Sequence, residues 1–371
     1  MPELYIGLMS GTSLDGVDGV LAEFDSSSCQ VLAHASAPLP ANLQAELLAL
    51  NQPGLNELHR AALAANALMQ VYADVAQQLL AATGSTFQQI IALGAHGQTV
   101  RHQPHIHGGT GYTIQLCNPA LLAELTGINV VADFRSRDVA AGGQGAPLVP
   151  VFHQAVFGHL GETTAVLNIG GMANLTVIGP ELSHDVMGFD CGPGNVLIDT
   201  WCQQQRHQAF DAGGAWAASG QIHAGLLSTL LAEPYFALPA PKSTGRDLFN
   251  PAWLQTRLTR HPGLAAQDIQ ATLTELTVRA CAECANSYAL NSKSILVCGG
   301  GAFNQHLMQR LQTLLPQFTV QSTAAHGLPP LQVEAAAFAW LARKAIRREP
   351  LALQNITGTP GARIAGGIFP A

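Results

Sequence analysis

Three apolar segments of this chain each run into a glycine-rich turn, and the three turns lie far apart in the sequence. The segments 4–10, 165–169 and 295–298 precede the turns 11–16, 170–174 and 299–304. Glycine lets the backbone approach a ligand because no Cβ intervenes, and it leaves N–H groups that can meet phosphate oxygens. Three such turns, each following a strand of buried character, predict a nucleotide held between two lobes.

Length and composition predict a compact protein with two domains. The chain has 371 residues, of which 48% are hydrophobic and only 11% charged, as in ordinary globular proteins. Its formal charge of −7 argues against nucleic acid or an anionic membrane as partner, because both require basic patches. No signal-like segment opens the chain and no stretch reaches about 20 apolar residues. We therefore expect a soluble, cytoplasmic protein, with a homodimer left open.

The pattern of strand, glycine turn and strand occurs twice along the chain. The predicted strands are 4–10, 17–24, 30–39, 90–97, 129–134, 165–169, 174–179, 185–190 and 294–298, and the main predicted helices are 56–82, 196–205, 268–290 and 332–347. This repeat predicts an α/β fold of two duplicated lobes around a cleft. We place the lobes at residues 1–135 and 136–351, with the tail 352–371 packing back on the first.

Two common phosphate-binding loops are not indicated. No G-x-G-x-x-G opens a helix after the first strand, which weakens a Rossmann interpretation. The P-loop pattern G-x-x-x-x-G-K-[ST] is absent from the sequence.

The first turn combines a phosphate-friendly backbone with hydroxyl and carboxylate side chains. Its candidate ligand-binding residues are Gly11, Thr12, Ser13, Leu14, Asp15, Gly16, Val17 and Asp18. Thr12 and Ser13 can donate to phosphoryl oxygens, while Asp15 or Asp18 could hold a hydrated Mg²⁺. The alternative is an ordinary hairpin turn that uses these residue types for turn geometry.

Asp190 is the candidate general base. It ends a predicted strand beside Gly192-Pro193-Gly194, just before a helix that starts at Val196. An aspartate there can take a proton from an attacking nucleophile, and the helix N-terminus favours anions. The alternative is a helix N-cap, a role that Asn195 could also fill.

Histidines and arginines supply further candidates. His96, His102, His105 and His107 invite a metal site, but no acidic ligand lies among them. His96, at a glycine-flanked strand end, is better explained as a substrate contact.

Arg135 and Arg137 follow Asp133 and precede a glycine-rich run at 142–145. Arginines of this kind clamp carboxylates or phosphates, although alternating charges are also common in solvated loops.

Eight segments taken in order resemble the anhydro-N-acetylmuramic acid kinase family over essentially the whole chain. They are residues 7–18, 94–102, 133–135, 142–150, 168–174, 189–195, 242–246 and 298–304. The resemblance implies an actin/hexokinase/Hsp70-like fold with ATP between the lobes. It also implies that ATP and water convert 1,6-anhydro-N-acetylmuramic acid into N-acetylmuramic acid 6-phosphate and ADP, in cell-wall recycling.

Roles follow from the same resemblance, position by position. Asp190 would activate the water that attacks the anomeric carbon, while O6 takes the γ-phosphoryl group. ATP would contact the first turn together with Gly170, Gly171, Gly299, Gly300 and Gly301, and Mg²⁺ would be held by Asp15 through water. Substrate contacts would come from His96, Gln98, Asp133, Arg135, Arg137 and Glu334. Competing hypotheses are a metal-dependent hydrolase using the histidine run and a non-catalytic ATP-driven clamp.

Overall fold

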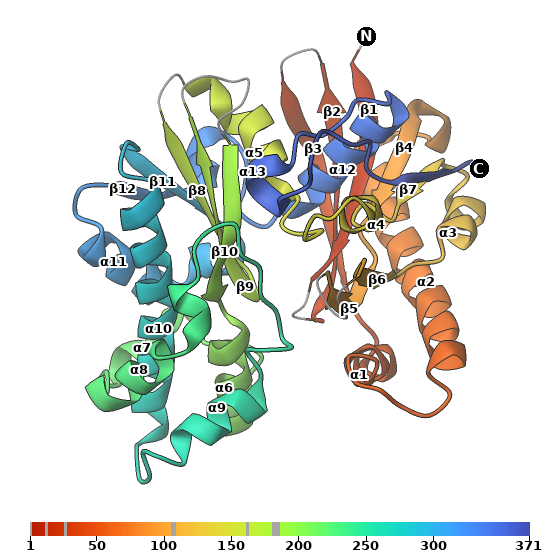
Figure 1. Ribbon diagram of the computed structural model, residues 1–371. Coiled ribbons are helices and arrows are strands. Elements are labelled where there is room, and N and C mark those ends of the chain that lie inside the picture. The colour runs from red at the N-terminus through yellow and green to blue at the C-terminus, as the bar shows by residue number, and fades with distance from the viewer. Residues whose placement is uncertain (1, 12–13, 26–27, 105–108, 161–162, 180–185) are drawn as a thin grey trace. The chain divides into compact units, whose positions relative to one another are not determined.

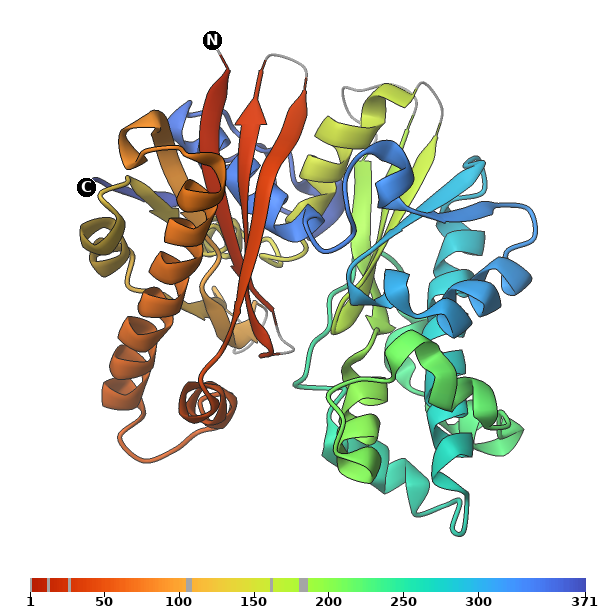
Figure 2. The same cartoon turned by 180° about the vertical axis from the view of Figure 1, so that it is seen from behind.

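The computed structural model divides the chain into two compact units. Unit 1 comprises Met1–Phe152 and Leu331–Ala371, and unit 2 comprises His153–Pro330. The structure describes residues 2–11, 14–25, 28–104, 109–160, 163–179 and 186–371. Each unit has its own main sheet and hydrophobic core (Figures 1 and 2).

The sheet of unit 1 has six strands in the order β13-β7-β4-β1-β2-β3. Their bounds are β1 Glu3–Ser10, β2 Gly16–Phe24, β3 Cys29–Pro38, β4 Ile90–Ala95, β7 Val130–Ala132 and β13 Gly367–Phe369. Strands β1, β2 and β3 pair antiparallel, whereas β4 is parallel to both β1 and β7. A separate hairpin consists of β5 Gln98–Gln103 and β6 Tyr112–Leu116.

Helices cover both faces of this sheet (Figure 1). They are α1 Ala41–Ala49, α2 Glu57–Thr83, α3 Pro119–Thr126, α4 Ser136–Ala140, α12 Val333–Ile346 and α13 Gln354–Thr357. Ile6 and Leu8 belong to the core formed with α2. Gly7 faces the other way, because side chains alternate along a strand. A Cβ on Gly7 would lie 1.9 Å from the Ala335 carbonyl oxygen, so α12 packs directly on the β1 backbone.

Unit 2 repeats the topology of unit 1. Its strands are β8 Thr164–Ile169, β9 Met172–Ile178, β10 Val186–Pro193, β11 Ser294–Cys298 and β12 Thr319–Ser322. The order β10-β9-β8-β11-β12 corresponds to β3-β2-β1-β4-β7, with the same antiparallel and parallel pairings. The predicted duplication of strand, glycine turn and strand is therefore confirmed.

The helices of unit 2 surround one buried helix, α10. Their bounds are α6 Val196–Arg206, α7 Ala215–Ser219, α8 Ala224–Leu231, α9 Pro251–Leu258, α10 Ala266–Tyr288 and α11 Gln305–Leu314, and α5 Val149–Phe157 spans the boundary between the units. Helix α10 packs against β9 and β10 and forms the core with Leu167, Leu175 and Phe189.

The structure differs from the sequence-based expectation in two respects. The chain passes between the units at 152/153 and 330/331 rather than at 135/136 and 351/352, because α12 packs on β1 and β4. The C-terminal tail belongs to unit 1, where β13 pairs with β7. Helix α1 and the β5–β6 hairpin were not predicted. Among the described residues, no helix has the length and apolar character to cross a bilayer.

Candidate functional site

The first glycine turn is anchored at its base by hydrogen bonds to the Gly11 carbonyl. That oxygen accepts from the Leu14 backbone N–H at 3.2 Å and from Gln98 Nε2 at 3.1 Å. Asp15 is exposed, and its Oδ1 accepts from the Gly16 N–H at 3.0 Å. Leu14 and Val17 belong to the unit 1 core. Thr12 and Ser13 lie outside the described residues. The turn thus combines the exposed carboxylate of Asp15 with the side chains of Leu14 and Val17, which are buried in the core of unit 1.

Asp18 lies on β2, beyond the turn itself. Its Oδ1 is 3.3 Å from His34 Nε2 on β3. The structure therefore places Asp18 in a cross-strand pair rather than beside Asp15.

His96 is buried and uses both ring nitrogens. Its side chain is 5% exposed, and Nδ1 lies 3.2 Å from the Ser10 carbonyl oxygen. Since a carbonyl can only accept, Nδ1 carries the proton and Nε2 is an acceptor. Arg135 donates to Nε2 from Nη2 at 3.0 Å and from Nε at 3.3 Å. Burial, and then the Arg135 charge, lowers the pKa of His96 to about 3. His96 is therefore a neutral support for Arg135.

The glycine-rich loop after α4 is held between Arg135 and Asp138. Arg135 Nη1 donates to the Gly145 carbonyl at 2.8 Å, and the Gly145 N–H donates to Asp138 Oδ2 at 2.7 Å. Asp138 is 1% exposed. Its other oxygen accepts from Thr357 Oγ1 at 2.8 Å and also from Thr359 Oγ1. This buried carboxylate joins α4, the loop and the C-terminal tail.

The remaining unit 1 candidates differ in exposure. Arg137 and Asp133 are exposed, and Asp133 has a left-handed backbone with φ of 57°. Glu334 is half-buried in the first turn of α12. Gln98 is 1% exposed, and its Oε1 has no partner among the described residues. Of the two arginines, Arg135 is the one fixed in orientation by contacts to its guanidinium.

In unit 2, Asp190 belongs to a polar row that crosses three strands. The register places Asn168 opposite Asn174, and Asn174 opposite Asp190. Their strand neighbours Leu167, Leu175 and Phe189 face α10, so by alternation the row lies on the opposite sheet face.

The side-chain oxygens of the two asparagines in this row lack partners. Asn168 is 2% exposed. The Oδ1 atoms of Asn168 and Asn174 are buried with no hydrogen-bond partner among the described residues. Buried acceptors without a hydrogen-bond partner are rare and energetically costly. The row is therefore suited to binding a hydrogen-bond donor or a cation. Sequence reasoning overlooked both asparagines, although their register with Asp190 follows from the predicted hairpins.

Asp190 is held by a segment about 50 residues further along the chain. Its backbone N–H donates to the Lys242 carbonyl at 2.9 Å, and its Oδ2 accepts from the Thr244 N–H at 2.9 Å. The Tyr235 hydroxyl donates to the Asp190 carbonyl at 2.8 Å. Lys242 Nζ donates to the Tyr235 and Phe236 carbonyls at 3.3 and 3.1 Å. These contacts fix a 7% exposed carboxylate, and the N-cap residue of α6 is Asn195.

The backbone N–H groups at the start of α6 are bonded to the second glycine turn. The N–H groups of Gly194 and Val196 donate to the Gly171 carbonyl at 2.9 and 3.1 Å, and that of Asn195 donates to the Gly170 carbonyl at 2.8 Å. Helix-initial N–H groups need such partners, and here the glycine turn supplies them. The second turn thus rests on α6.

Glycines of the second and third turns fall into two kinds. A Cβ on Gly299 would lie 2.5 Å from Asn168 Oδ1, and one on Gly301 would lie 2.4 Å from Ile169 Cγ2. On Gly170 or Gly300 the nearest atom would be 3.7 or 3.5 Å away. Gly299 and Gly301 are therefore required for packing, whereas a Cβ on Gly170 or Gly300 would make only ordinary van der Waals contacts.

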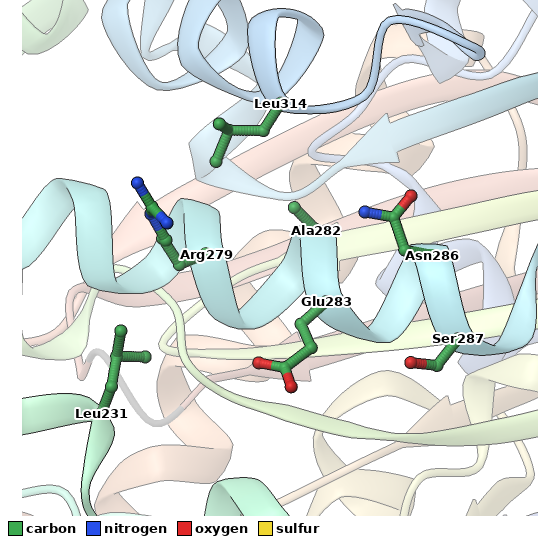
Figure 3. A pocket seen from close by; sticks show the side chains of 7 residues that line it. All are labelled: Leu231, Arg279, Ala282, Glu283, Asn286, Ser287 and Leu314. Carbon is green, nitrogen blue, oxygen red and sulfur yellow. The ribbon is translucent and has the colours of Figure 1, made fainter. Parts of the chain in front are cut away.

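A pocket on the outer side of α10 is separate from these residues. Its volume is about 370 Å³ (Figure 3). The lining residues are Leu231, Arg279, Ala282, Glu283, Asn286, Ser287 and Leu314. None of the sequence-predicted site residues lines it.

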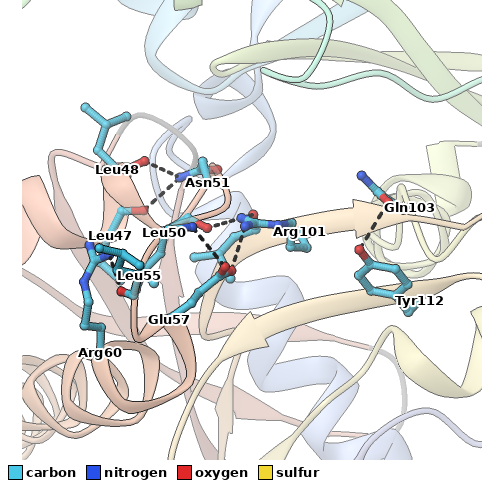
Figure 4. A network of polar contacts seen from close by, with 12 residues as sticks. Leu47, Leu48, Leu50, Asn51, Leu55, Glu57, Arg60, Arg101, Gln103 and Tyr112 are labelled. Atoms are coloured by element: carbon cyan, nitrogen blue, oxygen red, sulfur yellow. Dashed lines mark hydrogen bonds and ion pairs between the residues drawn. The ribbon is translucent and has the colours of Figure 1, made fainter.

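Arg101, within the segment 94–102 singled out in the sequence, has a structural role (Figure 4). Its Nη2 donates to Glu57 Oε1 at 2.7 Å, and its Nη1 donates to the Leu50 carbonyl. Arg101 therefore ties β5 to the connection between α1 and α2.

The histidine run forms no metal cluster in the part of the chain that the structure describes. His96 contacts Ser10 and Arg135, while His102 Nδ1 lies 3.0 Å from Thr113 Oγ1. His105 and His107 are outside the described residues.

Two units of this topology define the actin/hexokinase-like class of α/β proteins. One solved structure with this fold is (R)-2-hydroxyglutaryl-CoA dehydratase component A of Acidaminococcus fermentans. It aligns with a TM-score of 0.50 at 12% identity and covers 91% of this chain and 96% of its own. At that identity the likeness concerns the fold alone.

The family is shown by sequence. A model of the family "Anhydro-N-acetylmuramic acid kinase" matches residues 3–371. The protein of that name from Albidiferax ferrireducens is 62% identical, with 100% of both chains covered. The one from Variovorax paradoxus is 60% identical, covering 100% of this chain and 99% of its own. The chain belongs to the anhydro-N-acetylmuramic acid kinase family, which confirms the resemblance carried by its motifs.

Proposed function

We propose that the protein is an ATP-dependent sugar kinase that opens 1,6-anhydro-N-acetylmuramic acid hydrolytically and phosphorylates O6. The products would be N-acetylmuramic acid 6-phosphate and ADP, formed in the cytoplasm during peptidoglycan recycling. The observation that carries the proposal is full-length membership of the kinase family. It is supported by one carboxylate, Asp190, held rigidly on a polar sheet face. The proposed partner is the small sugar substrate. The homodimer also stays a prediction, which light scattering of the purified protein would test.

The proposed reaction has Asp190 as general base. A water oxygen bonds to C1 of the sugar while its proton passes to the Asp190 carboxylate. The C1–O6 bond breaks, and its electron pair stays on O6. O6 then bonds to the γ-phosphorus as the bond to ADP breaks. The Thr244 N–H on Oδ2, at 2.9 Å, orients the carboxylate for this transfer.

ATP would be bound by the three glycine turns. In the first, Gly11 to Asp18 would meet phosphate. In the second and third, Gly170, Gly171 and Gly299 to Gly301 would follow the nucleotide. Packing does not require glycine at Gly170 or Gly300, where a Cβ would make only ordinary contacts at 3.7 and 3.5 Å, and this supports the assignment.

Mg²⁺ would neutralise charge on the transferring phosphates. The residues present fit this ion, because Mg²⁺ takes oxygen ligands. Asp15 offers an exposed carboxylate, which would bind through water.

The anionic lactyl group of the sugar would bind Arg135. Its guanidinium is oriented by His96 and Gly145, and oriented guanidinium groups bind carboxylates well. Gln98, Asp133 and Glu334 complete the proposed substrate contacts, with the exposed Arg137 as the less favoured cation.

The test is an incubation with ATP, Mg²⁺ and 1,6-anhydro-N-acetylmuramic acid in ¹⁸O-water, followed by mass spectrometry. A 6-phosphorylated sugar with ¹⁸O at C1 and an equal amount of ADP would support both steps. ADP without labelled sugar phosphate would point to a different acceptor. Absence of ADP would contradict the kinase proposal.

Asp190→Asn tests the role of the base. We expect kcat to fall by at least a factor of about 100, as for loss of a general base, while nucleotide affinity stays within about twofold of wild type because the glycine turns are unchanged. The exposed Glu283 on α10 provides the matched control, Glu283→Gln. Retention of more than about a tenth of wild-type kcat, equivalent to about 1.4 kcal/mol, would remove Asp190 as base.

A further inference from the structure

His96 connects two predicted ligand sites of unit 1. Nδ1 donates to the Ser10 carbonyl at 3.2 Å, and Ser10 immediately precedes the glycine turn. On the other side of the ring, Nε2 accepts from Arg135 Nη2 at 3.0 Å. One imidazole therefore touches the backbone of the phosphate turn and the cation proposed for the sugar carboxylate.

The contact to Ser10 fixes the direction of a backbone donor. The Ser10 carbonyl and the Gly11 N–H belong to one planar peptide group. Holding the carbonyl oxygen on His96 therefore sets where the Gly11 N–H points. Gln98 Nε2 holds the next carbonyl, that of Gly11, at 3.1 Å. Two consecutive peptide groups at the start of the turn are thus oriented by side chains from the segment after β4.

The imidazole is enclosed by neighbouring groups. The backbone N–H of His96 donates to the Leu8 carbonyl at 3.0 Å and fixes the main chain there. The ring packs on Phe338, with centroids 4.7 Å apart, and Phe338 packs on Phe134 at 5.5 Å. A shift of the Arg135 guanidinium therefore moves the ring, and a shift of the ring moves the Ser10–Gly11 peptide.

The protonation state supports the same connection. A charged imidazole would donate from both nitrogens and could not accept from Arg135. Burial and the Arg135 charge lower the pKa of His96 to about 3, so the ring is neutral at physiological pH. The donor to Ser10 and the acceptor for Arg135 are thus both kept.

We propose that His96 is a positioning residue that couples anion binding at Arg135 to phosphate binding at the Gly11 turn. This inference rests on the proposed function, because it takes both sites from it. Coupling between sites is reciprocal, so nucleotide should tighten sugar binding by the same factor as sugar tightens nucleotide binding. In such an enzyme, ATP alone would be bound less tightly than ATP beside its acceptor.

The experiment measures affinity for 1,6-anhydro-N-acetylmuramic acid by calorimetry, with and without Mg²⁺ and a non-hydrolysable ATP analogue. In the wild type, we expect the ratio of sugar affinity with the analogue to sugar affinity without it to be at least about five, the lower end of typical couplings. In His96→Phe the ratio should fall to about one, because phenylalanine keeps a ring but can neither donate to Ser10 nor accept from Arg135. His153→Phe is the matched control: His153 is also fully buried, with a pKa lowered to about 3, but it contacts Thr176.

The outcomes separate this inference from the proposed function. A wild-type ratio of one, or a ratio unchanged in His96→Phe, would overturn the coupling while leaving the kinase proposal intact. Failure of the wild type to bind either ligand would overturn the proposed function, and the coupling with it. A merely structural role would lower thermal stability but leave the ratio unchanged. If His96→Phe does not fold, Phe338→Leu loosens the ring support without removing either hydrogen bond, and it should also reduce the ratio.

Discussion

His153 should make the stability of unit 2 depend on pH in a way that one substitution removes. The residue is fully buried on α5, where its Nδ1 lies 2.8 Å from Thr176 Oγ1. Its Nε2 has no hydrogen-bond partner within the described chain. Burial lowers the pKa of His153 to about 3, against about 6.5 in an unfolded chain. Between these two values the unfolded state binds more protons than the folded state.

The sign and size of the effect follow from proton linkage. A lowered histidine pKa contributes stability that is fully present above about pH 6.5 and is lost as the pH falls toward 3. From pH 7 to pH 5 the unfolded side chain goes from mostly neutral to almost fully protonated. The free energy of unfolding should therefore fall by about 2 kcal/mol from this residue alone.

Urea unfolding followed by tryptophan fluorescence measures this, since Trp201, Trp216 and Trp253 all lie in unit 2. Wild type should lose about 2 kcal/mol more than His153→Gln between pH 7 and pH 5. Because the comparison uses pH slopes, any constant cost of the substitution cancels. His207→Asn, at an exposed histidine, should keep the wild-type slope. Equal slopes in wild type and His153→Gln would refute the reasoning.

Three further substitutions separate packing from ligand binding. Asp138→Asn should destabilise unit 1 by about 2–3 kcal/mol in thermal or urea unfolding. The buried carboxylate accepts hydrogen bonds from the glycine loop and the tail, and the amide NH2 of asparagine could not accept them. Asp74→Asn, at an exposed aspartate, is the control, and equal stability of the two variants would contradict the prediction. Gly300→Ala should leave stability within about 0.5 kcal/mol but weaken nucleotide binding in a fluorescence titration, because its Cβ would meet the protein only in an ordinary contact at 3.5 Å and would extend toward the proposed nucleotide. Gly301→Ala, with a Cβ 2.4 Å from Ile169, should instead destabilise by about 1–3 kcal/mol, and nucleotide affinity unchanged in Gly300→Ala would count against a ligand there.

The sequence was sufficient for the repeated topology but not for the partners of the site residues. Alternating apolar residues followed by glycine are a local signal. The first antiparallel strands of each unit, and the position of Asp190 on a strand, could therefore be predicted. The supports of Asp190 come from Tyr235 and Thr244, which only tertiary packing brings close. His96 was expected to contact substrate; its contact to Arg135, 39 residues away, shows a second role that no local pattern indicates.

The glycines explain why a motif of this kind identifies a family more readily than it identifies ligand contacts. On β1 and β4, Gly7 and Gly94 allow α12 to approach, since a Cβ would lie 1.9 and 2.1 Å from its carbonyl oxygens. Gly301 is needed equally for packing, against the end of β8. Each of these glycines is as necessary as one that faces a phosphate, because a side chain would displace backbone or core atoms. Only the space around each residue distinguishes the two roles: at Gly170 and Gly300 a Cβ would make only ordinary contacts, at 3.7 and 3.5 Å, so packing does not require glycine there.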